Sequence, residues 1–432
     1  MVGGCVRDRL LGVESKDIDI EVFGIPAERL ERIVGERHPY SLCGVSFGVL
    51  KLKNVDIDVS LPRRESKCGI GHRGFSVLSD PSLSVAEASL RRDFTINAIY
   101  LDPLTDEVID PNGGIADLKA KVLRHVIPKF VEDPLRVLRG MQFVARFDLE
   151  PAPETIQICR GIGLEGLAAE RMEEEWTKLL LKGVRISKGL EFLRSTGWIS
   201  FYPQLEALVG CRQDPKWHPE GDVWEHTKCC LDAFAERRTG DSHEDLVVGL
   251  AVLCHDLGKP KCSFFDRSVG RIRSLGHDEQ GVAPARAFLE GILGERALID
   301  EVLPLVECHM RPYALWKSKA REGAIRRLSA KVKRIDRLVR VCTADDAGRP
   351  PFKAETEPLE WLLAEAKRLE VADSAPKPLL MGRDLLAAGM RPGPEFGRIL
   401  AKAYEAQLDG VFTDREGAID WFRHDGGYRK AT

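Results

Sequence analysis

The hydrophobic pattern of this 432-residue chain changes its period once, close to residue 118. Before that point, short β-branched runs alternate with polar residues at positions 17–23, 49–52, 55–59, 75–78 and 96–100. A period of two is typical of strands that bury one face of a sheet, and residues 26–35 between them have a helical pattern. From residue 119 onward, beginning with 134–146, apolar residues recur at helical spacing and we expect no strand. The sequence therefore predicts an α/β head followed by all-α domains.

The length and composition of the chain limit the kinds of protein that it can be. A chain of 432 residues is too long for one core, which favours two to four domains. Its longest apolar run, residues 246–254, falls far short of the roughly 20 residues that cross a bilayer. The 11 cysteines include no C-x-x-C pair, which predicts reduced thiols in a cytoplasmic protein. A net charge of -3 excludes coating of nucleic acid by bulk charge, but not a local basic site.

A glycine turn and two acids form the first chemical pattern. Gly3 and Gly4 open the segment that continues to Arg7 and Asp8, and such a turn lets backbone approach a phosphate closely. Further on are three acids of the strand patterns: Asp17, Asp19 and Asp58. On a strand, residues 17 and 19 project from one face, and paired carboxylates facing a phosphate suit Mg²⁺.

Each half of this pattern is common by itself, since Gly-Gly turns and D-x-D sequences occur in many surface strands. In this order and at this distance they favour a metal site over a surface turn. Only two residues precede Gly3, so either the start lies upstream or the sheet lacks most of one strand.

Further segments follow in a fixed order at residues 91–98, 110–118, 132–139 and 170–176. Together with the glycine turn and the acids, this series resembles the class II tRNA nucleotidyltransferases and their poly(A) polymerase relatives in the DNA polymerase β superfamily. The resemblance covers roughly the first 210 residues. It implies transfer of CMP and AMP from CTP and ATP to a tRNA 3′ end without a nucleic-acid template, with Mg²⁺ held by Asp17 and Asp19.

The resemblance also implies roles for the remaining polar residues. Arg92 and Asp93 would contact the ribose, and Arg139 would bind the triphosphate. Asp133 and Arg136 would present an acceptor beside donors, which fits the edges of cytosine and adenine and mismatches guanine and uracil. The full nucleotide-binding set comprises Gly3, Gly4, Arg7, Asp8, Arg92, Asp93, Asn97, Glu132, Asp133, Arg136 and Arg139. Without the preceding motifs, Asp133 and Arg136 would be read as an ordinary ion pair on a helix surface.

The helical half contains a second set of candidate ligands, His226, His255, Asp256, His277, His309 and Asp345. Their order resembles the HD-domain metal-dependent phosphohydrolases. Imidazole and carboxylate together suit Ni²⁺, Mn²⁺, Co²⁺ or Zn²⁺ better than Mg²⁺. A metal there would activate water for attack on phosphate, with Lys259 facing the anion. An isolated histidine is more often a structural residue than a ligand, and His218 stays ambiguous.

These expectations divide the chain into a polymerase β-like head (1–118), a nucleotide-selecting and RNA-binding neck and body (119–215), an HD domain (216–350) and a helical tail (351–432). The expected function is CCA addition, with 2′,3′-cyclic phosphodiesterase or phosphatase activity at the HD centre. Alternatives are an enzyme that adds only CC or only A, a poly(A) polymerase, and an RNA-binding regulatory HD protein. Segment 43–52 and the near-neutral charge disfavour the poly(A) polymerase. The Gly-rich segment 69–74 is a candidate flexible element for switching from C to A.

Overall fold

The structure is a computed structural model that describes residues 1–15, 17–43, 48–67, 75–352 and 356–424. The Gly-rich segment 69–74, predicted to switch nucleotides, lies outside these residues. The chain divides into two compact units, Met1–Pro203 with Ile292–Gly294, and Gln204–Gly291 with Glu295–Thr432. Among the described residues, every helix is too short or too polar to span a bilayer.

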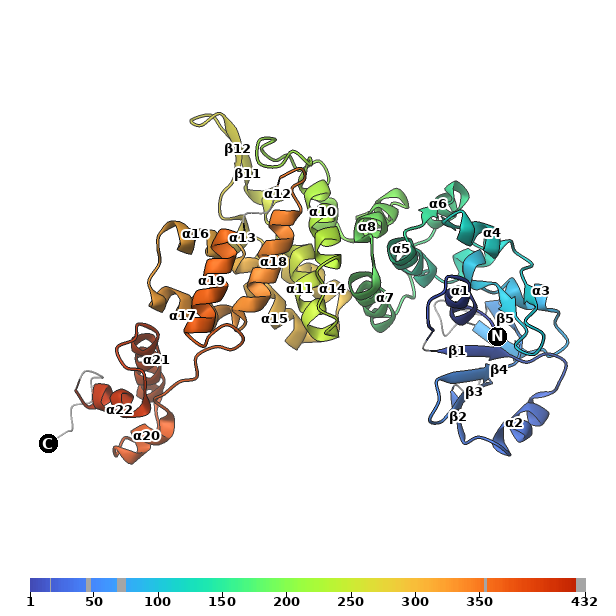
Figure 1. Ribbon diagram of the computed structural model, residues 1–432, viewed down its shortest axis with the longest axis horizontal. Helices are drawn as coiled ribbons and strands as arrows, with labels where there is room; N and C mark the ends of the chain where they lie inside the picture. Colours follow the sequence, from blue (N-terminus) through green and yellow to red (C-terminus); the bar gives the residue numbers. More distant parts are fainter. Residues whose placement is uncertain (16, 44–47, 68–74, 353–355, 425–432) are drawn as a thin grey trace. The chain divides into compact units, whose positions relative to one another are not determined.

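A four-stranded sheet forms the base of the first unit, in the order β1-β4-β3-β2. Its strands are β1 (Ile18–Glu21), β2 (Tyr40–Cys43), β3 (Val49–Leu52) and β4 (Ile57–Ser60). β1 runs parallel to β4, whereas β3 is antiparallel to both of its neighbours. Helix α2 (Ala27–Gly35) precedes β2 (Figure 1), and its buried Leu30 belongs to one core cluster with Leu50, Leu52 and Val59 of the sheet. The strands predicted near 17–23, 49–52 and 55–59, and the helix at 26–35, are confirmed, with bounds that differ at some ends.

Short elements complete the head. They are α1 (Gly4–Leu10), β5 (Arg63–Lys67), β6 (Phe75–Ser79), α3 (Val85–Ser89), η2 (Thr95–Asn97), β7 (Tyr100–Leu101), β8 (Val108–Ile109), α4 (Gly114–Lys119), β9 (Val122–Leu123) and η3 (Pro128–Glu132). The predicted strand at 75–78 is confirmed as part of β6. The strand predicted at 96–100 is wrong, because 95–97 form a 3-10 turn and only Tyr100 joins a strand. Ile96, Ala98 and Ile99 are all fully buried, and such a run is not specific to strands.

The remaining elements of the first unit are mostly helical: α5 (Leu135–Phe147), β10 (Glu150–Pro151), α6 (Pro153–Cys159), α7 (Ala169–Lys182), α8 (Ile186–Ser195) and η4 (Trp198–Phe201). The helix predicted at 134–146 is confirmed, and Pro134 caps it where its missing N–H has no helical partner. α5 and α8 approach closely through two glycines. A Cβ at Gly140 would lie 2.9 Å from the Phe192 ring, and one at Gly189 would lie 2.8 Å from the Met141 carbonyl oxygen.

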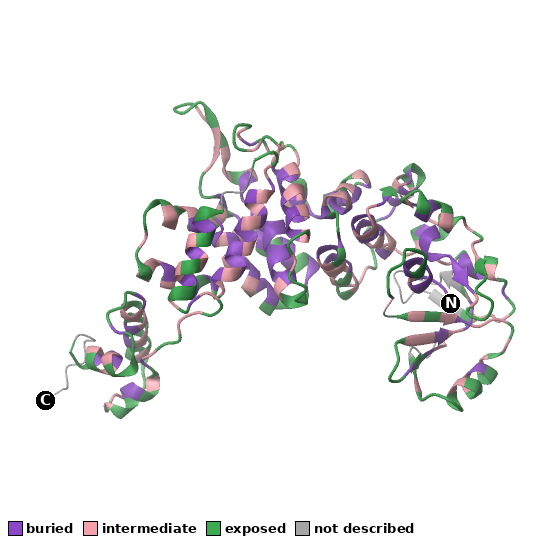
Figure 2. Cartoon of the chain, in the orientation of Figure 1, coloured by how far each residue is buried: buried purple, intermediate pink, exposed green. Residues whose placement is uncertain are grey.

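The second unit is a bundle of helices built around α11. The helices from the junction onward are α9 (Pro203–Glu206), α10 (Val223–Ala235), α11 (Ser242–Cys254), α12 (Lys259–Cys262), α13 (His277–Gln280), α14 (Val282–Ile292), α15 (Arg296–Cys308), α16 (Arg311–Lys317), α17 (Glu322–Val332), α18 (Ile335–Ala347) and α19 (Glu357–Arg368). Residues Val247 to Cys254 of α11 are all buried, because α10, α15 and α18 pack around this helix. Figure 2 shows buried residues gathered along α10, α11 and α18.

The expectation of no strand after residue 119 is wrong. β9 pairs with β10, and a protruding hairpin joins β11 (Ser263–Asp266) to β12 (Arg271–Ser274). Phe264 and Phe265 are adjacent and both exposed, so the hairpin lacks the alternation that marks a half-buried strand. The chain ends in α20 (Gly382–Ala387), α21 (Pro394–Leu408) and α22 (Arg415–His424), which share a small core of their own.

Candidate active site and candidate metal centre

A cavity of about 720 Å³ opens in the first unit between α1, the start of β1, and helices α5 and α7. It gathers most of the residues that the sequence predicts for nucleotide binding and catalysis. Those that line it are Gly3, Gly4, Arg7, Asp8, Asp17, Asp19, Arg92, Asp93, Asn97, Asp133, Arg136 and Arg139. Two predicted residues, Asp58 and Glu132, are not part of the lining, although Asp58 lies beside Asp19 in the register of β4 with β1.

The glycine turn is required by the space at the cavity wall. Gly3 has a φ of +80°, which residues with a side chain rarely adopt. A Cβ at this position would lie 3.0 Å from Nη1 of Arg92 and 3.4 Å from Oδ2 of Asp19. Helix α1 begins at the next residue, Gly4. Because position 3 has no side chain, the Asp19 carboxylate and the Arg92 guanidinium can both lie close to the backbone at this side of the cavity.

The acids of the cavity repel one another. Asp17 and Asp19 are both exposed to the cavity, and Asp58 lies one strand away. Desolvation raises the pKa of Asp19, and the charges of Asp58 and Asp17 raise it further, although Arg92 opposes them. Carboxylate oxygens are the ligands that Mg²⁺ prefers, and a bound cation would relieve this repulsion. The donor set therefore fits Mg²⁺.

A buried network connects the arginines of α1 and α5. Arg7 donates to Oδ1 of Asp8 at 2.7 Å and to Oδ1 of Asn97 at 2.5 Å. Asn97 in turn donates to Asp93, and Nε of Arg139 donates to the other oxygen of Asp93 at 2.7 Å. Burial alone would raise the pKa of Asp93, but Arg139 and Asn97 lower it to about 2. Asp93 therefore stays ionised and fixes the side chain of Arg139 at the cavity.

Asp133 and Arg136 face the same cavity, and their side chains do not pair with each other, although the Arg136 amide donates to the Asp133 carbonyl at 3.1 Å. Nη2 of Arg171 lies 2.9 Å from Oδ2 of Asp133, and Arg136 donates to the backbone carbonyl of Arg91 at 2.8 Å. The two residues are not neighbours on one helix as expected, because Asp133 is extended and precedes α5, and the ordinary ion pair between them does not form. Both side chains are instead held by groups far away in sequence.

Arg171 belongs to a row of cations that the sequence analysis missed. Arg171, Lys178 and Lys182 of α7 all line the cavity, at a spacing that places them on one helix face. Their spacing in the sequence could have indicated a basic helix face. The three acids between them, Glu173 to Glu175, made the segment look like an ordinary charged surface.

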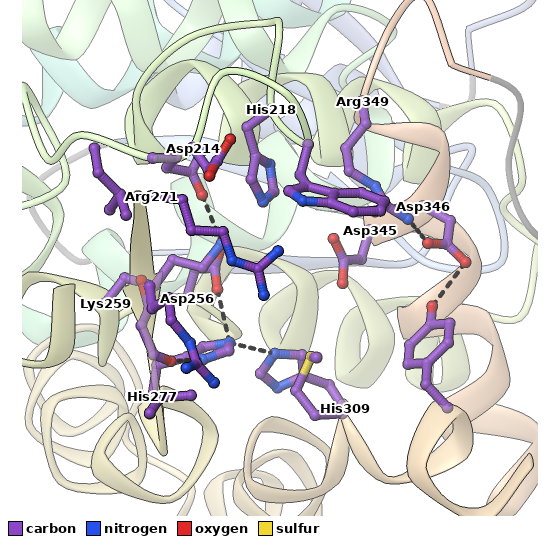
Figure 3. A pocket seen from close by; sticks show the side chains of 18 residues that line it. Asp214, His218, Asp256, Lys259, Arg271, His277, His309, Asp345, Asp346 and Arg349 are labelled. Atoms are coloured by element: carbon purple, nitrogen blue, oxygen red, sulfur yellow. Dashed lines mark hydrogen bonds and ion pairs between the residues drawn. The ribbon is translucent and has the colours of Figure 1, made fainter. Parts of the chain in front are cut away.

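A second cavity, of about 470 Å³, lies in the second unit beside the predicted metal ligands. Asp256, His277, His309 and Asp345 line it and point toward the same space in Figure 3. His226 and His255 are fully buried behind them and contact the same acids. Nε2 of His226 lies 3.0 Å from Oδ1 of Asp345, and Nε2 of His255 lies 3.2 Å from Oδ2 of Asp256. The structure thus brings all six predicted residues together.

Backbone carbonyls set the orientation of three imidazoles in this cluster. Nδ1 of His255, His277 and His309 each lies 2.7 Å from the carbonyl oxygen three residues earlier. A carbonyl only accepts, so each Nδ1 carries a proton, and in the neutral form of each ring it is Nε2 that offers a lone pair. Nε2 of His277 and Nε2 of His309 are only 3.1 Å apart, and two lone pairs cannot bond to each other. This arrangement of donors fits a transition-metal ion between them.

The protonation states of His309 and Asp345 agree with a cation site, whereas His226 would have to lose a proton to bind a metal. Burial would lower the pKa of His226, but Cys230, Asp345 and Glu220 raise it well above its ordinary value. Burial and the neighbouring imidazoles His255 and His277 lower the pKa of His309 to about 4, so this ring is neutral near pH 7. Burial opposes ionisation of Asp345, but His226 and His255 keep its pKa well below the usual range. Neutral imidazoles and ionised carboxylates are the protonation states that bind metals.

Glu220 and Cys230 belong to this cluster although they were not predicted, and Lys259 has a different partner from the one expected. Oε1 of Glu220 lies 2.8 Å from Nδ1 of His226 and 2.9 Å from Nδ1 of His218, so it orients both rings. Cys230 places its sulfur 3.5 Å from Nε2 of His226. Lys259, expected to meet the anion, is buried and lies 2.7 Å from Oδ2 of Asp256. The spacing of Cys230 from His226, one helical turn, was the only available signal for it.

Known proteins resemble the chain over nearly its whole length. Residues 1–124 match the family model described as the poly A polymerase head domain. The multifunctional CCA protein of Xanthomonas campestris pv. campestris strain B100 is 35% identical over 94% of this chain and 97% of the relative. A solved CCA-adding enzyme with CTP superposes with a TM-score of 0.58 at 20% identity, covering 99% and 91% of the two chains. The Thermotoga maritima CCA-adding enzyme complexed with tRNA gives 0.54 at 20% identity, covering 97% and 89%. The chain therefore belongs to the family of the multifunctional CCA proteins.

Proposed function

We propose that this chain adds CMP and AMP to the 3′ end of tRNA, with CTP and ATP as substrates. The observation that carries the proposal is the cavity of the first unit, where Asp17 and Asp19 face a wall of arginines. In each step the primer 3′-hydroxyl oxygen attacks the α-phosphorus, and the bond to pyrophosphate breaks as the new ester forms. The names of the relatives, which concern CCA addition, support the same reaction.

Asp17 and Asp19 are the proposed Mg²⁺ ligands, with Asp58 supporting Asp19 from the neighbouring strand. Bound Mg²⁺ would supply Lewis acidity toward the attacking hydroxyl and neutralise charge on the triphosphate. The residues of the chain do the positioning. Arg139, fixed by Asp93, contributes a cation for the phosphates, and Arg92 reaches the ribose beside Gly3.

Asp133 and Arg136 are the proposed selectors of the incoming base. The carboxylate of Asp133 would accept from the amino group of cytosine or adenine, and Arg136 would donate to the adjacent ring nitrogen. Arg171 and the Arg91 carbonyl hold these two side chains before any base arrives. Guanine and uracil would leave buried polar groups unpaired, which disfavours them strongly.

Substitution of one acid tests the head. Asp19→Asn keeps the shape of the side chain but removes a charged ligand, and we expect CMP incorporation into tRNA lacking CCA to fall by roughly 100-fold or more. Asp106→Asn is the matched control, because Asp106 is an exposed acid paired with Arg9 and does not line the cavity. Equal incorporation by Asp19→Asn and the control would contradict the proposed role. Absence of incorporation by the parent protein would favour an RNA-binding regulatory protein.

The cluster of the second unit favours a second activity, hydrolysis of 2′,3′-cyclic phosphodiesters or phosphomonoesters. The observation that carries it is the set of three imidazoles whose Nε2 atoms gather beside Asp256. Those of His255 and His277 lie 3.2 and 3.4 Å from its oxygens, and that of His309 lies 3.1 Å from Nε2 of His277. His226, His255, Asp256 and Asp345 would hold one metal ion, and His277 and His309 would recruit a second. Metal bound there would supply an activated water. The water oxygen attacks phosphorus, the ester P–O bond breaks, and the leaving alkoxide takes up a proton.

Hydrolysis is tested with adenosine 2′,3′-cyclic monophosphate and protein supplied with Ni²⁺. We expect His255→Ala to abolish hydrolysis while CMP incorporation into tRNA continues, because His255 belongs to the other unit. His243→Ala is the control, since this exposed histidine pairs with Glu301 outside the cavity. No hydrolysis by the parent protein with Ni²⁺, Mn²⁺ or Co²⁺ would reject the second activity and leave the first one standing.

A further inference from the structure

Glu21 is a buried acid of β1, two residues after the proposed Mg²⁺ ligand Asp19. Residues two apart on a strand project from one face, so the two carboxylates leave β1 on the same side. Asp19 lines the head cavity, whereas Glu21 does not, and only 1% of the Glu21 side chain is exposed. A carboxylate loses much of its hydration on burial, so it needs partners that replace the lost water.

Both oxygens of Glu21 have such a partner in a distant part of the head. Oε1 accepts from Nη2 of Arg91 at 2.5 Å, and Oε2 accepts from the hydroxyl of Tyr100 at 2.7 Å. These partners are 70 and 79 residues away along the chain. The Arg91 side chain is only 19% exposed and Tyr100 is buried, so both contacts are shielded from water, unlike an ion pair at the surface. One carboxylate therefore fixes a guanidinium and a phenol ring together.

Each partner of Glu21 in turn contacts an arginine that lines the cavity. The backbone carbonyl of Arg91 accepts from Nη2 of Arg136, the proposed base selector, at 2.8 Å. The guanidinium of Arg92, the proposed ribose contact, lies 5.6 Å from the centre of the Tyr100 ring. At this distance the ring attracts a cation. A single acid outside the cavity lining thus supports two of the side chains proposed to meet the nucleotide.

We propose that Glu21 is a positioning residue that sets the selectivity of the head cavity for the sugar and the base of the incoming nucleotide. It acts through Tyr100 on Arg92, which meets the ribose, and through Arg91 on Arg136, which meets the base. A guanidinium held in one place discriminates between a ribose and a deoxyribose, whereas a mobile one adapts to either. The inference rests on the proposed nucleotidyl transfer, and adds to it a residue that does not touch the substrate.

Ratios of kcat/KM between nucleotides separate positioning from a purely structural role, because a loss of folded protein lowers incorporation of every nucleotide equally. Glu21→Gln keeps the shape but turns an amide N–H₂ toward one of the two donors. We expect it to lower the preference for CTP over 2′-deoxyCTP, and that for CTP over UTP, by roughly tenfold each. Tyr100→Phe keeps the ring and the pair of Glu21 with Arg91, and should lower only the preference for the ribose, by roughly threefold to tenfold.

Glu28→Gln is the matched control, because Glu28 is an exposed acid of α2 that does not line the cavity, and both of its ratios should equal those of the parent. Calorimetric binding of CTP and 2′-deoxyCTP to the full chain with Mg²⁺ is measured alongside. Ratios that neither Glu21→Gln nor Tyr100→Phe alters overturn the inference and leave nucleotidyl transfer standing. A binding preference for CTP that Glu21→Gln removes, in a parent that incorporates no CMP into tRNA, supports the inference and rejects CMP addition. A parent that shows neither preference nor incorporation rejects both.

Discussion

At the level of single residues, the shape of the head cavity depends on the absence of a side chain at Gly3. Gly3 places its backbone between Asp19 and Arg92, and any Cβ would enter the space of the Arg92 guanidinium. Because Asp19 is the proposed ligand and Arg92 the proposed ribose contact, this glycine controls two functions at once. A substitution at Gly3 should therefore lower activity by more than its effect on stability explains.

Gly3→Ala is predicted to lower CMP incorporation by roughly tenfold to 100-fold, because the added methyl displaces Arg92. Gly12→Ala is the control. Gly12 also has a positive φ, +70°, but a Cβ there meets nothing within 4 Å. Both substitutions should reduce the free energy of unfolding by about 1 kcal/mol. Equal incorporation by the two variants would show that the clash is irrelevant.

Asp93 gives a prediction about pH. Its pKa falls from the ordinary 3.8 to about 2 in the folded chain, so ionised Asp93 stabilises the fold above pH 3.8, and this contribution disappears as pH falls through 2. Asp93→Asn should cost about 2 kcal/mol at pH 7, and the difference from the parent should shrink between pH 4 and pH 2. Urea-dependent hydrogen exchange of peptides from residues 1–203 measures it. A difference that stays constant down to pH 2 would contradict the assignment.

At the level of elements, local pattern predicted most of the fold that positions the site. α2, α5, β1, β3, β4 and β6 have the expected periodicity, and each is confirmed. The strand expected at 96–100 is wrong because both sides of that segment are buried, so its apolar run carries no period. The β11–β12 hairpin was missed because it is exposed and follows no core pattern.

The candidate sites were predictable where residue type and order carry the chemistry, as with Asp17, Asp19 and the histidines. Their supporting contacts were not. Arg171 meets Asp133 across 38 residues, and Arg139 meets Asp93 across 46, and no local pattern encodes such pairs. Tertiary packing decides which cation reaches which carboxylate, whereas the sequence shows only which charged residues are present.

The packing of α5 on α8 yields a prediction at this scale. Gly189→Ala forces a methyl to within 2.8 Å of the Met141 carbonyl oxygen and of a Leu179 methyl, and the backbone carbonyl cannot move away without moving a helix. We expect a loss of about 1–3 kcal/mol of stability, measured by urea unfolding. Gly291→Ala is the control, because a Cβ in that helix meets nothing within 4 Å, so it should be neutral or stabilising. Equal stability of both variants would contradict the close approach.

At the level of the whole molecule, the chain contains two compact units and each has its own cavity. The first cavity has candidate oxygen ligands and a row of cations, which suits the proposed Mg²⁺ and triphosphate. The second has candidate imidazole ligands oriented by backbone carbonyls, which suits the proposed transition metal and phosphate ester. The net charge of -3 does not reveal either cavity, because the cations of each are balanced by nearby acids. The proposed reactions are opposite in direction, one forming and one breaking phosphate esters.

The most direct measurement is sequencing of the ends added to tRNA that lacks CCA, first with CTP alone and then with CTP and ATP. The proposed function predicts addition of CC with CTP alone and of CCA with both nucleotides, without GMP or UMP when all four are present. Long oligo(A) ends, formed equally on an unrelated RNA, would contradict it.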